Sequence, residues 1–379
     1  MPQESCAFAC RFGRIDPRRV EVPRGTLVST LMMSPLEHAG KTVTIREVAE
    51  EAGVSVGTVS RVLNAPATVR PATLEKVRAV IDRMGFQPDP RAQNMRRRTT
   101  MTVGFIINDI TNPMHSNVFK AAEAELRPRG FTLHLVNTGG EPQREAAAID
   151  MLQRGRVDGL MMTINSEQDA ECRARLATLR VPGVLLDREV PVHIDSVMTD
   201  HATGMRQAVD YLIGLGHRRI ALITAGTDIS PGRERKRGFV EAFANRGIPC
   251  PEDLIRARHL SAAYGQRETS TLLRLADPPT AIIAGGNQIL VGVLHAIQQQ
   301  GIEIGRDLSL VTCDRTDLAT TYPGPLTLID RDVEAIGRTA ADLLLERMAE
   351  KSVDPPRRVV FPTTLILGHS CGPPRPRAA

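Results

Sequence analysis

The chain has 379 residues and 42% of them are hydrophobic, which excludes a predominantly disordered protein and leaves room for two or three domains. Its formal net charge of +5 indicates a mild preference for anionic partners. No apolar run reaches membrane-spanning length and the first residues do not form a secretory signal, so we expect no membrane association and a cytoplasmic location.

The two ends of the chain carry no periodic pattern. Residues 1–40 contain several Pro, Gly and Arg, which predicts a disordered extension. Met32 and Met33 stand just before the first recognisable element, so the alternative is that translation begins there and the start is misassigned. Residues 371–379 are rich in proline and show no heptad pattern, so we expect a disordered tail rather than a tetramer-forming coil.

Residues 44–64 contain two short helical patterns around one turn. Apolar residues of the first recur at i, i+3, i+4 and i+7: Ile45, Val48, Ala49 and Ala52. Gly53 ends this helix, and Ser55 can cap the next. The outer face of the second helix is small, polar and basic, with Gly57, Ser60, Arg61 and Asn64. This pattern is typical of a helix-turn-helix whose second helix enters a DNA major groove; an ordinary pair of packed helices is the alternative.

A third helix completes a small all-α domain at 42–86. Its inner face carries Leu74, Val77, Ile81 and Met84, and Gly85 ends it. Between residues 42 and 98 there are ten Lys or Arg and six Asp or Glu, a balance of +4. Most of the net positive charge therefore accompanies the helix-turn-helix, as binding to a polyanion requires.

Residues 87–98 form a basic connecting segment. Pro88 and Pro90 exclude a helix continuous with the preceding one, and Asp89 can cap a new short helix that runs through Met95. By charge alone, a solvated linker is the simpler interpretation.

From Met101 the pattern changes to alternating strands and helices. Strands are predicted at 103–107, 132–136, 157–162, 183–186, 219–224, 280–284 and 308–312. Helices are predicted at 114–129, 143–154, 167–179, 202–215, 232–247, 265–275 and 287–300. Repeated βαβ units favour parallel sheets with helices on both faces, and the length of 101–370 suits two such lobes.

Polar residues follow the predicted strands. Ligands of open α/β sheets bind beyond the carboxyl ends of the strands, so these residues are candidates for a binding site. Each one alone is more simply a solvated loop residue, but together they predict a cleft for a small polar molecule. The candidates are Asp109, Asn112, His115, Arg188, Arg233, Asn287, Gln288 and Asp314.

The stretch Thr-Ile-Arg-Glu-Val-Ala-Glu-Glu-Ala-Gly-Val-Ser-Val-Gly-Thr-Val-Ser-Arg-Val-Leu-Asn at 44–64 closely resembles the signature of the LacI family of bacterial transcription regulators. Asp-Ile-Thr-Asn-Pro at 109–113 is similar to that family's motif after the first strand. The resemblance covers 42–370. It implies an α/β protein with an N-terminal helix-turn-helix domain and a two-lobed core like a periplasmic binding protein. It also implies a homodimeric repressor of a near-palindromic operator, controlled by a small-molecule effector.

The resemblance implies roles for individual residues. Segment 87–98 matches a hinge helix that orders on DNA, in which Ala92 is the small residue and Met95 the wedge that opens a minor-groove base step. Val56, Gly57 and Arg61 should face base edges, with Arg61 the best candidate for a direct base contact. The complete set expected at DNA is Thr44, Ser55, Val56, Gly57, Thr58, Ser60, Arg61, Asn64, Ala92 and Met95.

Three departures from the family pattern concern the effector. Met114-His115 replaces a pair of phenylalanines, and Asn287-Gln288 replaces Asn-Asp, which removes a carboxylate. Arg315 follows Asp314 and adds a cation. We therefore expect an anionic or strongly polar effector, such as a sugar acid or a phosphorylated metabolite, rather than a neutral hexose.

Other functions find less support in the motifs. Gly214-x-Gly216 follows a helix and precedes a strand, the reverse of a dinucleotide-binding loop, so we do not expect an enzyme. The six cysteines form no Cys-x-x-Cys pair and no His-Glu-x-x-His occurs, so we expect neither a metal site nor a cofactor. A small-molecule binding protein without a transcriptional role is the alternative that remains.

Overall fold

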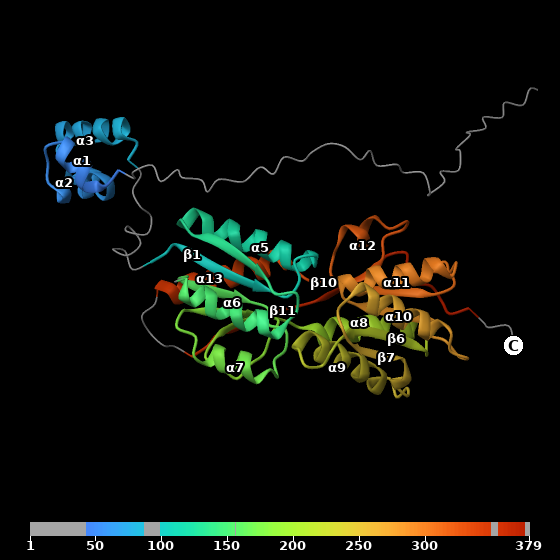
Figure 1. Cartoon of the computed structure of the whole chain (residues 1–379). Helices are drawn as coiled ribbons and strands as arrows, with labels where there is room; N and C mark the ends of the chain where they lie inside the picture. Colours follow the sequence, from blue (N-terminus) through green and yellow to red (C-terminus); the bar gives the residue numbers. More distant parts are fainter. Residues whose placement is uncertain (1–42, 87–98, 156, 350–354, 376–379) are drawn as a thin grey trace, which may run out of the picture. The chain divides into compact units, whose positions relative to one another are not determined.

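The computed structural model describes residues 43–86, 99–155, 157–349 and 355–375, in two compact units divided near Pro88. Within these described ranges, the first unit contains three α-helices and the second contains two sheets, whose covering helices can be followed in Figure 1. The predicted extension at 1–40 and the predicted hinge helix with Ala92 and Met95 lie outside the described residues. No helix in the described ranges is long and apolar enough to cross a membrane.

The first unit contains α1 (Ile45–Glu51), α2 (Val56–Asn64) and α3 (Pro71–Met84), with a 3-10 turn at Pro66–Thr68. Thr44 begins α1 in a capping box with Glu47, and Ser55 begins α2 by accepting a hydrogen bond from the Thr58 N–H at 3.2 Å. The apolar faces meet in one buried cluster: Val48, Ala49, Ala52, Val59, Val62, Val77, Val80 and Phe86. The predicted helix-turn-helix is confirmed.

The ends of α3 follow the residues that flank it. Arg70 makes no side-chain hydrogen bond to the helix start, but Pro71 occupies the first helical position, where its fixed φ suits a helix. Gly85 ends the helix with φ of +62°, a conformation that costs glycine little. The N–H of Phe86 then donates to the Ile81 carbonyl at 3.0 Å and closes the helix.

Lobe 1 of the second unit is built on a parallel six-stranded sheet. The strand order is β11 (Arg358–Phe361), β5 (Asp195–Thr199), β4 (Gly183–Leu186), β3 (Gly159–Met162), β1 (Thr102–Ile107) and β2 (Thr132–Asn137). One face packs against α5 (Pro113–Leu126) and α13 (Val333–Ala349). The other packs against α6 (Pro142–Arg154) and α7 (Ala170–Ala177). Burial on both faces explains why the central strands β1, β3 and β4 are almost entirely apolar.

Lobe 2 repeats this design. Its strand order is β12 (Thr364–Ile366), β10 (Thr327–Asp330), β9 (Ser309–Cys313), β8 (Ala281–Gly285), β6 (Ile220–Ala225) and β7 (Ile255–Arg258), with only β12 antiparallel. On one face lie α8 (His201–Gly214) and α9 (Ser230–Asn245). On the other lie α10 (Ala262–Leu273) and α11 (Asn287–Gln299). A short α12 (Asp317–Thr321) follows β9, and 3-10 turns occur at Arg127–Arg129 and Glu252–Leu254.

The chain passes between the lobes three times. It leaves lobe 1 after β5, returns after β10, and leaves again after β11. Because the strand orders match, β4 and β9 occupy equivalent central positions, and the crossing segments run next to them. The predicted two-lobed fold is confirmed, and the crossings place residues 199–201 and 330–332 beside the carboxyl ends of both sheets.

Several elements were not predicted: β5, β7, β10, β11, β12, α12 and α13. The disordered tail was predicted to begin at residue 371, but the chain is still bonded to lobe 2 at Gly372. His217 lies 2.9 Å from the Gly372 carbonyl through Nε2, and the Gly372 N–H donates to Ser309 at 3.0 Å. These bonds fix the chain against lobe 2 as far as Gly372, because a buried histidine and a buried serine need partners.

Candidate functional site

The outer face of α2 is the candidate DNA surface. Val56 is 37% exposed, and four exposed residues lie beside it: Ser55, Gly57, Arg61 and Asn64. Thr58 and Ser60 are half-buried. The face therefore presents one aliphatic side chain, short polar groups and one guanidinium, which suits contact with base edges and phosphates. Thr44 is exposed at the start of α1.

Local hydrogen bonds hold the polar side chains of α2 against their own helix. The Arg61 Nε–H donates to the Gly57 carbonyl at 3.4 Å, and the Asn64 amide donates to the Ser60 carbonyl at 2.9 Å. Both bonds are exposed and weak, so either group can turn to a phosphate or a base at small cost. A Cβ on Gly57 would come no closer than 3.7 Å to Ser55 Oγ, so nothing inside this unit requires glycine there.

A cleft of about 800 Å³ lies in the second unit between the carboxyl ends of the two sheets. Lobe 1 contributes Asp109, Asn112, His115 and Arg188, and lobe 2 contributes Asn287, Gln288 and Asp314. Seven of the eight predicted ligand residues therefore line one cavity. The inference from strand ends works because parallel strands deliver their following loops to one edge.

Arg233 is the exception. It is not among the residues that line the cleft, and its guanidinium binds Glu167 of lobe 1 at 2.9 Å and Glu189 at 3.4 Å. Glu167 also accepts a hydrogen bond from the Ser230 N–H at 2.7 Å. The prediction of Arg233 as a ligand residue is not supported. It belongs instead to a clasp between the lobes, formed by Glu167, Glu189, Ser230 and Arg233.

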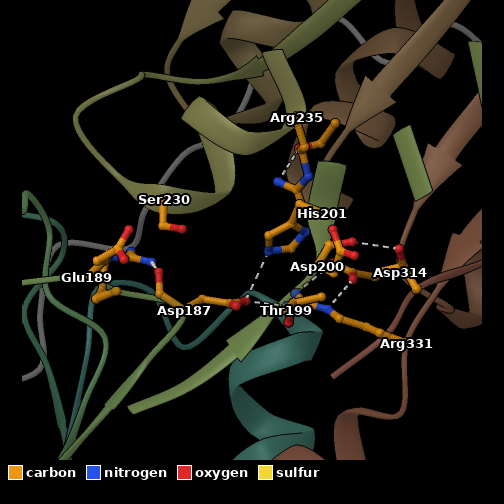
Figure 2. A network of polar contacts seen from close by, with 12 residues as sticks. Asp187, Glu189, Thr199, Asp200, His201, Ser230, Arg235, Asp314 and Arg331 are labelled. Carbon is orange, nitrogen blue, oxygen red and sulfur yellow. Dashed lines mark hydrogen bonds and ion pairs between the residues drawn. The ribbon is translucent and has the colours of Figure 1, made fainter. Parts of the chain in front are cut away.

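Arg235 takes the place expected of Arg233. It follows two positions later on α9, about 200° around the helix, so it faces inward while Arg233 faces the rim. Its side chain is buried; Nη1 donates to the Gly285 carbonyl at 2.9 Å, and Nε has no partner. Figure 2 shows Arg235 beside His201.

Arg188 is the second buried guanidinium of the cleft. It donates to the carbonyl oxygens of Ile164 and Asp187. Burial lowers the pKa of Arg188, and the nearby carboxylate of Asp187 opposes this shift. Among the described residues, no carboxylate oxygen lies within 4.0 Å of Arg188 or Arg235. Two buried cationic groups thus line the cavity without a carboxylate partner.

His115 supplies a neutral group next to them. Burial lowers the pKa of His115 to about 4, and the Arg188 and Arg331 charges act in the same direction. Nδ1 lies 2.8 Å from the Asp109 carbonyl, which can only accept, so Nδ1 carries the proton and Nε2 is an acceptor. Burial acts to raise the pKa of Asp109, but hydrogen bonds from Thr111 and Gln288 outweigh it and lower the pKa below its ordinary value.

An ion network closes the back of the cleft, at the crossings between the lobes (Figure 2). Arg331 binds Asp314 of lobe 2 through Nε at 2.7 Å, binds Asp187 of lobe 1, and donates to Thr199 at 2.9 Å. His201 lies 3.3 Å from Asp187, and burial together with the Arg235 charge lowers the pKa of His201 to about 4. Burial disfavours both carboxylates, but Arg331 holds the pKa of Asp187 and that of Asp314 below their usual range.

Arg315 does not add its charge to the cleft, contrary to expectation. Its exposed guanidinium binds Asp330 at 2.6 Å on the outer side. A different cation lines the cleft, Arg331, which follows the unpredicted strand β10. Other lining residues that the sequence did not single out are Asn165, Gln168, Arg258, His259 and Ser261. Within the described ranges, no group of three or more His, Cys, Asp or Glu side chains could hold a metal ion.

Two family models match the chain. Residues 44–89 match the model described as bacterial regulatory proteins, lacI family, and residues 209–371 match a periplasmic binding protein-like domain. The chain is 31% identical over 313 residues to the HTH-type transcriptional repressor PurR of Vibrio vulnificus (strain CMCP6), covering 82% of this chain and 93% of the repressor. It is also 31% identical to the ribose operon repressor of Escherichia coli (strain K12), covering 86% of this chain and 99% of that protein.

A solved structure agrees with this. The lac repressor dimer, bound to operator and the anti-inducer ONPF, superposes with a TM-score of 0.77 and 28% identity, covering 87% of this chain and 99% of the other. The similarity thus includes both units, the helix-turn-helix and the two-lobed core.

Proposed function

This chain belongs to the LacI family of bacterial transcription regulators, and we propose that an anionic small molecule controls its affinity for a near-palindromic operator. It is a DNA-binding transcriptional repressor with a periplasmic-binding-like effector domain. The alternative, a binding protein without a transcriptional role, does not explain a helix-turn-helix unit that matches this family.

For the DNA surface, we propose that Arg61 makes the main base contact and that Val56 packs beside it. Gly57 has no side chain and can only permit close approach, so discrimination between operators rests on its neighbours. Ser55, Thr58, Ser60 and Asn64 would mainly bind phosphates, and Thr44 would do the same from α1. Such contacts release counterions, so operator affinity should fall steeply as salt is raised.

We propose a homodimer whose two hinge segments bind the minor groove, with Met95 as the wedge. The support is the match of residues 44–89 to the family model and the likeness to a repressor dimer bound to operator. A gel shift with the operator found by genome-wide mapping of bound sites tests the wedge. Met95→Gly should weaken binding, because an unstacked base step needs an apolar side chain to fill it. Binding as tight as the wild type's contradicts the assignment.

The charge of the effector is inferred from one observation: Arg188 and Arg235 are buried in the cleft and lack a carboxylate partner. Each guanidinium can donate to a carboxylate or phosphate, and such charge-assisted bonds contribute about 1.5–3 kcal/mol each. Unpaired buried acceptors lie beside them, namely Asn108 Oδ1 and Asn287 Oδ1. An anion that also carries hydroxyl groups would satisfy both kinds of atom, so we propose a sugar acid or a phosphorylated sugar.

Calorimetry on the full chain with matched pairs, ribose against ribose 5-phosphate and glucose against gluconate, tests this proposal. The acidic member of at least one pair should bind about tenfold or more tightly than the neutral member, a difference of ~1.4 kcal/mol. That member should also change operator affinity, since coupling of ~1–3 kcal/mol is typical of such proteins. Tight binding of neutral sugars alone contradicts the anionic effector.

A further inference from the structure

We propose that Arg331 sets the charge specificity of the cleft by taking the carboxylates of Asp187 and Asp314 out of ligand binding. The inference rests on the proposed anionic effector, and it identifies the residue that makes an anion acceptable. Arg331 is a specificity-determining residue here, because it would act through the two carboxylates rather than through direct contact with the ligand.

Arg331 is placed to reach both lobes. It stands immediately after β10, where the chain crosses from lobe 2 to lobe 1. Its guanidinium donates to the Asp314 carboxylate through Nε at 2.7 Å and Nη2 at 3.3 Å, and to the Asp187 carboxylate through Nη1. All three side chains are at least 90% buried and all three line the cleft. All three nitrogens of one guanidinium thus donate to carboxylates that would otherwise be available to a ligand in the cavity.

The two carboxylates occupy equivalent places in the lobes. Asp187 directly follows β4 and Asp314 directly follows β9, and each N–H donates at 2.9 Å to the neighbouring strand, to Val197 and Ile329 respectively. Both residues have a positive φ, +50° and +66°, which is unfavourable for a side chain with a Cβ. Aspartate is among the few residues with a Cβ that tolerate this backbone, so both lobes can present a carboxylate at the same place.

The charges follow from this pairing. The buried charged side chains of the lining are Arg188, Arg235 and Arg331 with Asp187 and Asp314, and they sum to +1. The more exposed Asp109, Asp228 and Arg258 add −1, so the whole lining sums to zero. Without the Arg331 charge the buried sum is zero and the whole lining carries −1, and two buried carboxylates become free to repel an anion or to bind the hydroxyl groups of a neutral polyol. The other groups near them do not replace its ion pairs. His201 bonds to Asp187 with its pKa lowered to about 4, Thr199 is uncharged, and Arg235 lowers the pKa of Asp314 through its charge but forms no ion pair with it within 4.0 Å.

Inorganic phosphate is the probe for the test, titrated calorimetrically into the full chain at constant ionic strength. Arg331→Gln should bind phosphate about tenfold more weakly than the wild type, and R331Q/D314N, which removes one carboxylate as well, should recover to within about threefold. Arg315→Gln is the matched control. Arg315 directly follows Asp314 but is paired with Asp330 and does not line the cleft, so this variant should bind phosphate with the affinity of the wild type.

The outcomes separate the two proposals. A wild type that does not bind phosphate contradicts the anionic effector. A wild type that binds phosphate together with an Arg331→Gln variant of equal affinity overturns the role of Arg331 alone. Weakening that the double variant fails to reverse also overturns it, because the loss then does not come from freed carboxylates. If Arg331→Gln does not fold, the phosphate affinity of R331Q/D314N is compared with that of the wild type instead. Loss of phosphate binding by the double variant would contradict the role proposed for Arg331.

Discussion

Acid should destabilise this protein through His115, and the size of the effect follows from its burial. The folded-state pKa of His115 is about 4, against an ordinary value of 6.5. Between these values the unfolded chain takes up a proton at this residue and the folded chain does not, so acid favours unfolding. The stability is fully present above pH 6.5 and is lost as the pH falls toward 4. Between pH 7 and pH 5, linkage gives a loss of about 2 kcal/mol from this residue alone.

Replacement of His115 by asparagine isolates this effect. The shorter amide side chain also has an N–H near the position of Nδ1, so His115→Asn can still donate to the Asp109 carbonyl but does not titrate. Urea unfolding at pH 8, 7 and 5 then gives the free energy of unfolding for both proteins. The wild type should lose about 2 kcal/mol more than the variant between pH 7 and 5, and the two should run parallel between pH 8 and 7. Equal losses between pH 7 and 5 would refute the reasoning.

Three further predictions concern the two units. Gly57→Ala should raise the unfolding free energy of the helix-turn-helix unit by about 0.5–1 kcal/mol, since a Cβ meets nothing closer than 3.7 Å; an unchanged melting transition of that unit would be the contrary result. Glu167→Gln should increase amide hydrogen exchange at Ser230, whose N–H donates to that carboxylate, by weakening the clasp; unchanged protection would show that the clasp does not hold the lobes. Arg61→Ala should weaken operator binding by ~1–3 kcal/mol in a gel shift and relax preference at one base pair, whereas uniform weakening on all sequences would assign Arg61 to phosphate.

The sequence predicted the helix-turn-helix and most strands because their determinants are local. Caps at Ser55 and Gly85 and apolar periodicity need no knowledge of distant residues. Strand β5 was not predicted because it begins with Asp195, a charged residue whose burial requires its ion pairs with Arg347 and Arg357. Such partners are more than 150 residues away and cannot be seen in a local pattern. Helix α13 could have been predicted, since Ile336, Ala340, Leu343 and Leu344 have helical spacing.

The candidate site shows the same division. The strand ends predicted seven residues that line the cleft. They also predicted Arg233, whereas Arg235 lines the cleft, because a local pattern does not fix the start of α9 to the residue. An error of one residue in the predicted start of a helix rotates every predicted side-chain direction by about 100°. Such an error is enough to place a side chain at the rim of the cleft that in fact points into it. Arg331 was missed together with β10, whose four residues are too few for a periodic signal. Which carboxylate a guanidinium selects depends on both lobes at once, so only the structure could pair it with Asp187 and Asp314.

The three crossings between the lobes have a consequence for synthesis of the protein. The core of lobe 1 includes Ile336, Ala340 and Leu344 of α13, although its first five strands are complete at Thr199. About 150 residues must leave the ribosome in between, which takes roughly 8–30 s at ordinary rates of translation. During that interval the face of the nascent sheet that α13 will cover stays open to water. We therefore expect lobe 1 to engage chaperones on the ribosome and to mature only after most of lobe 2 has emerged.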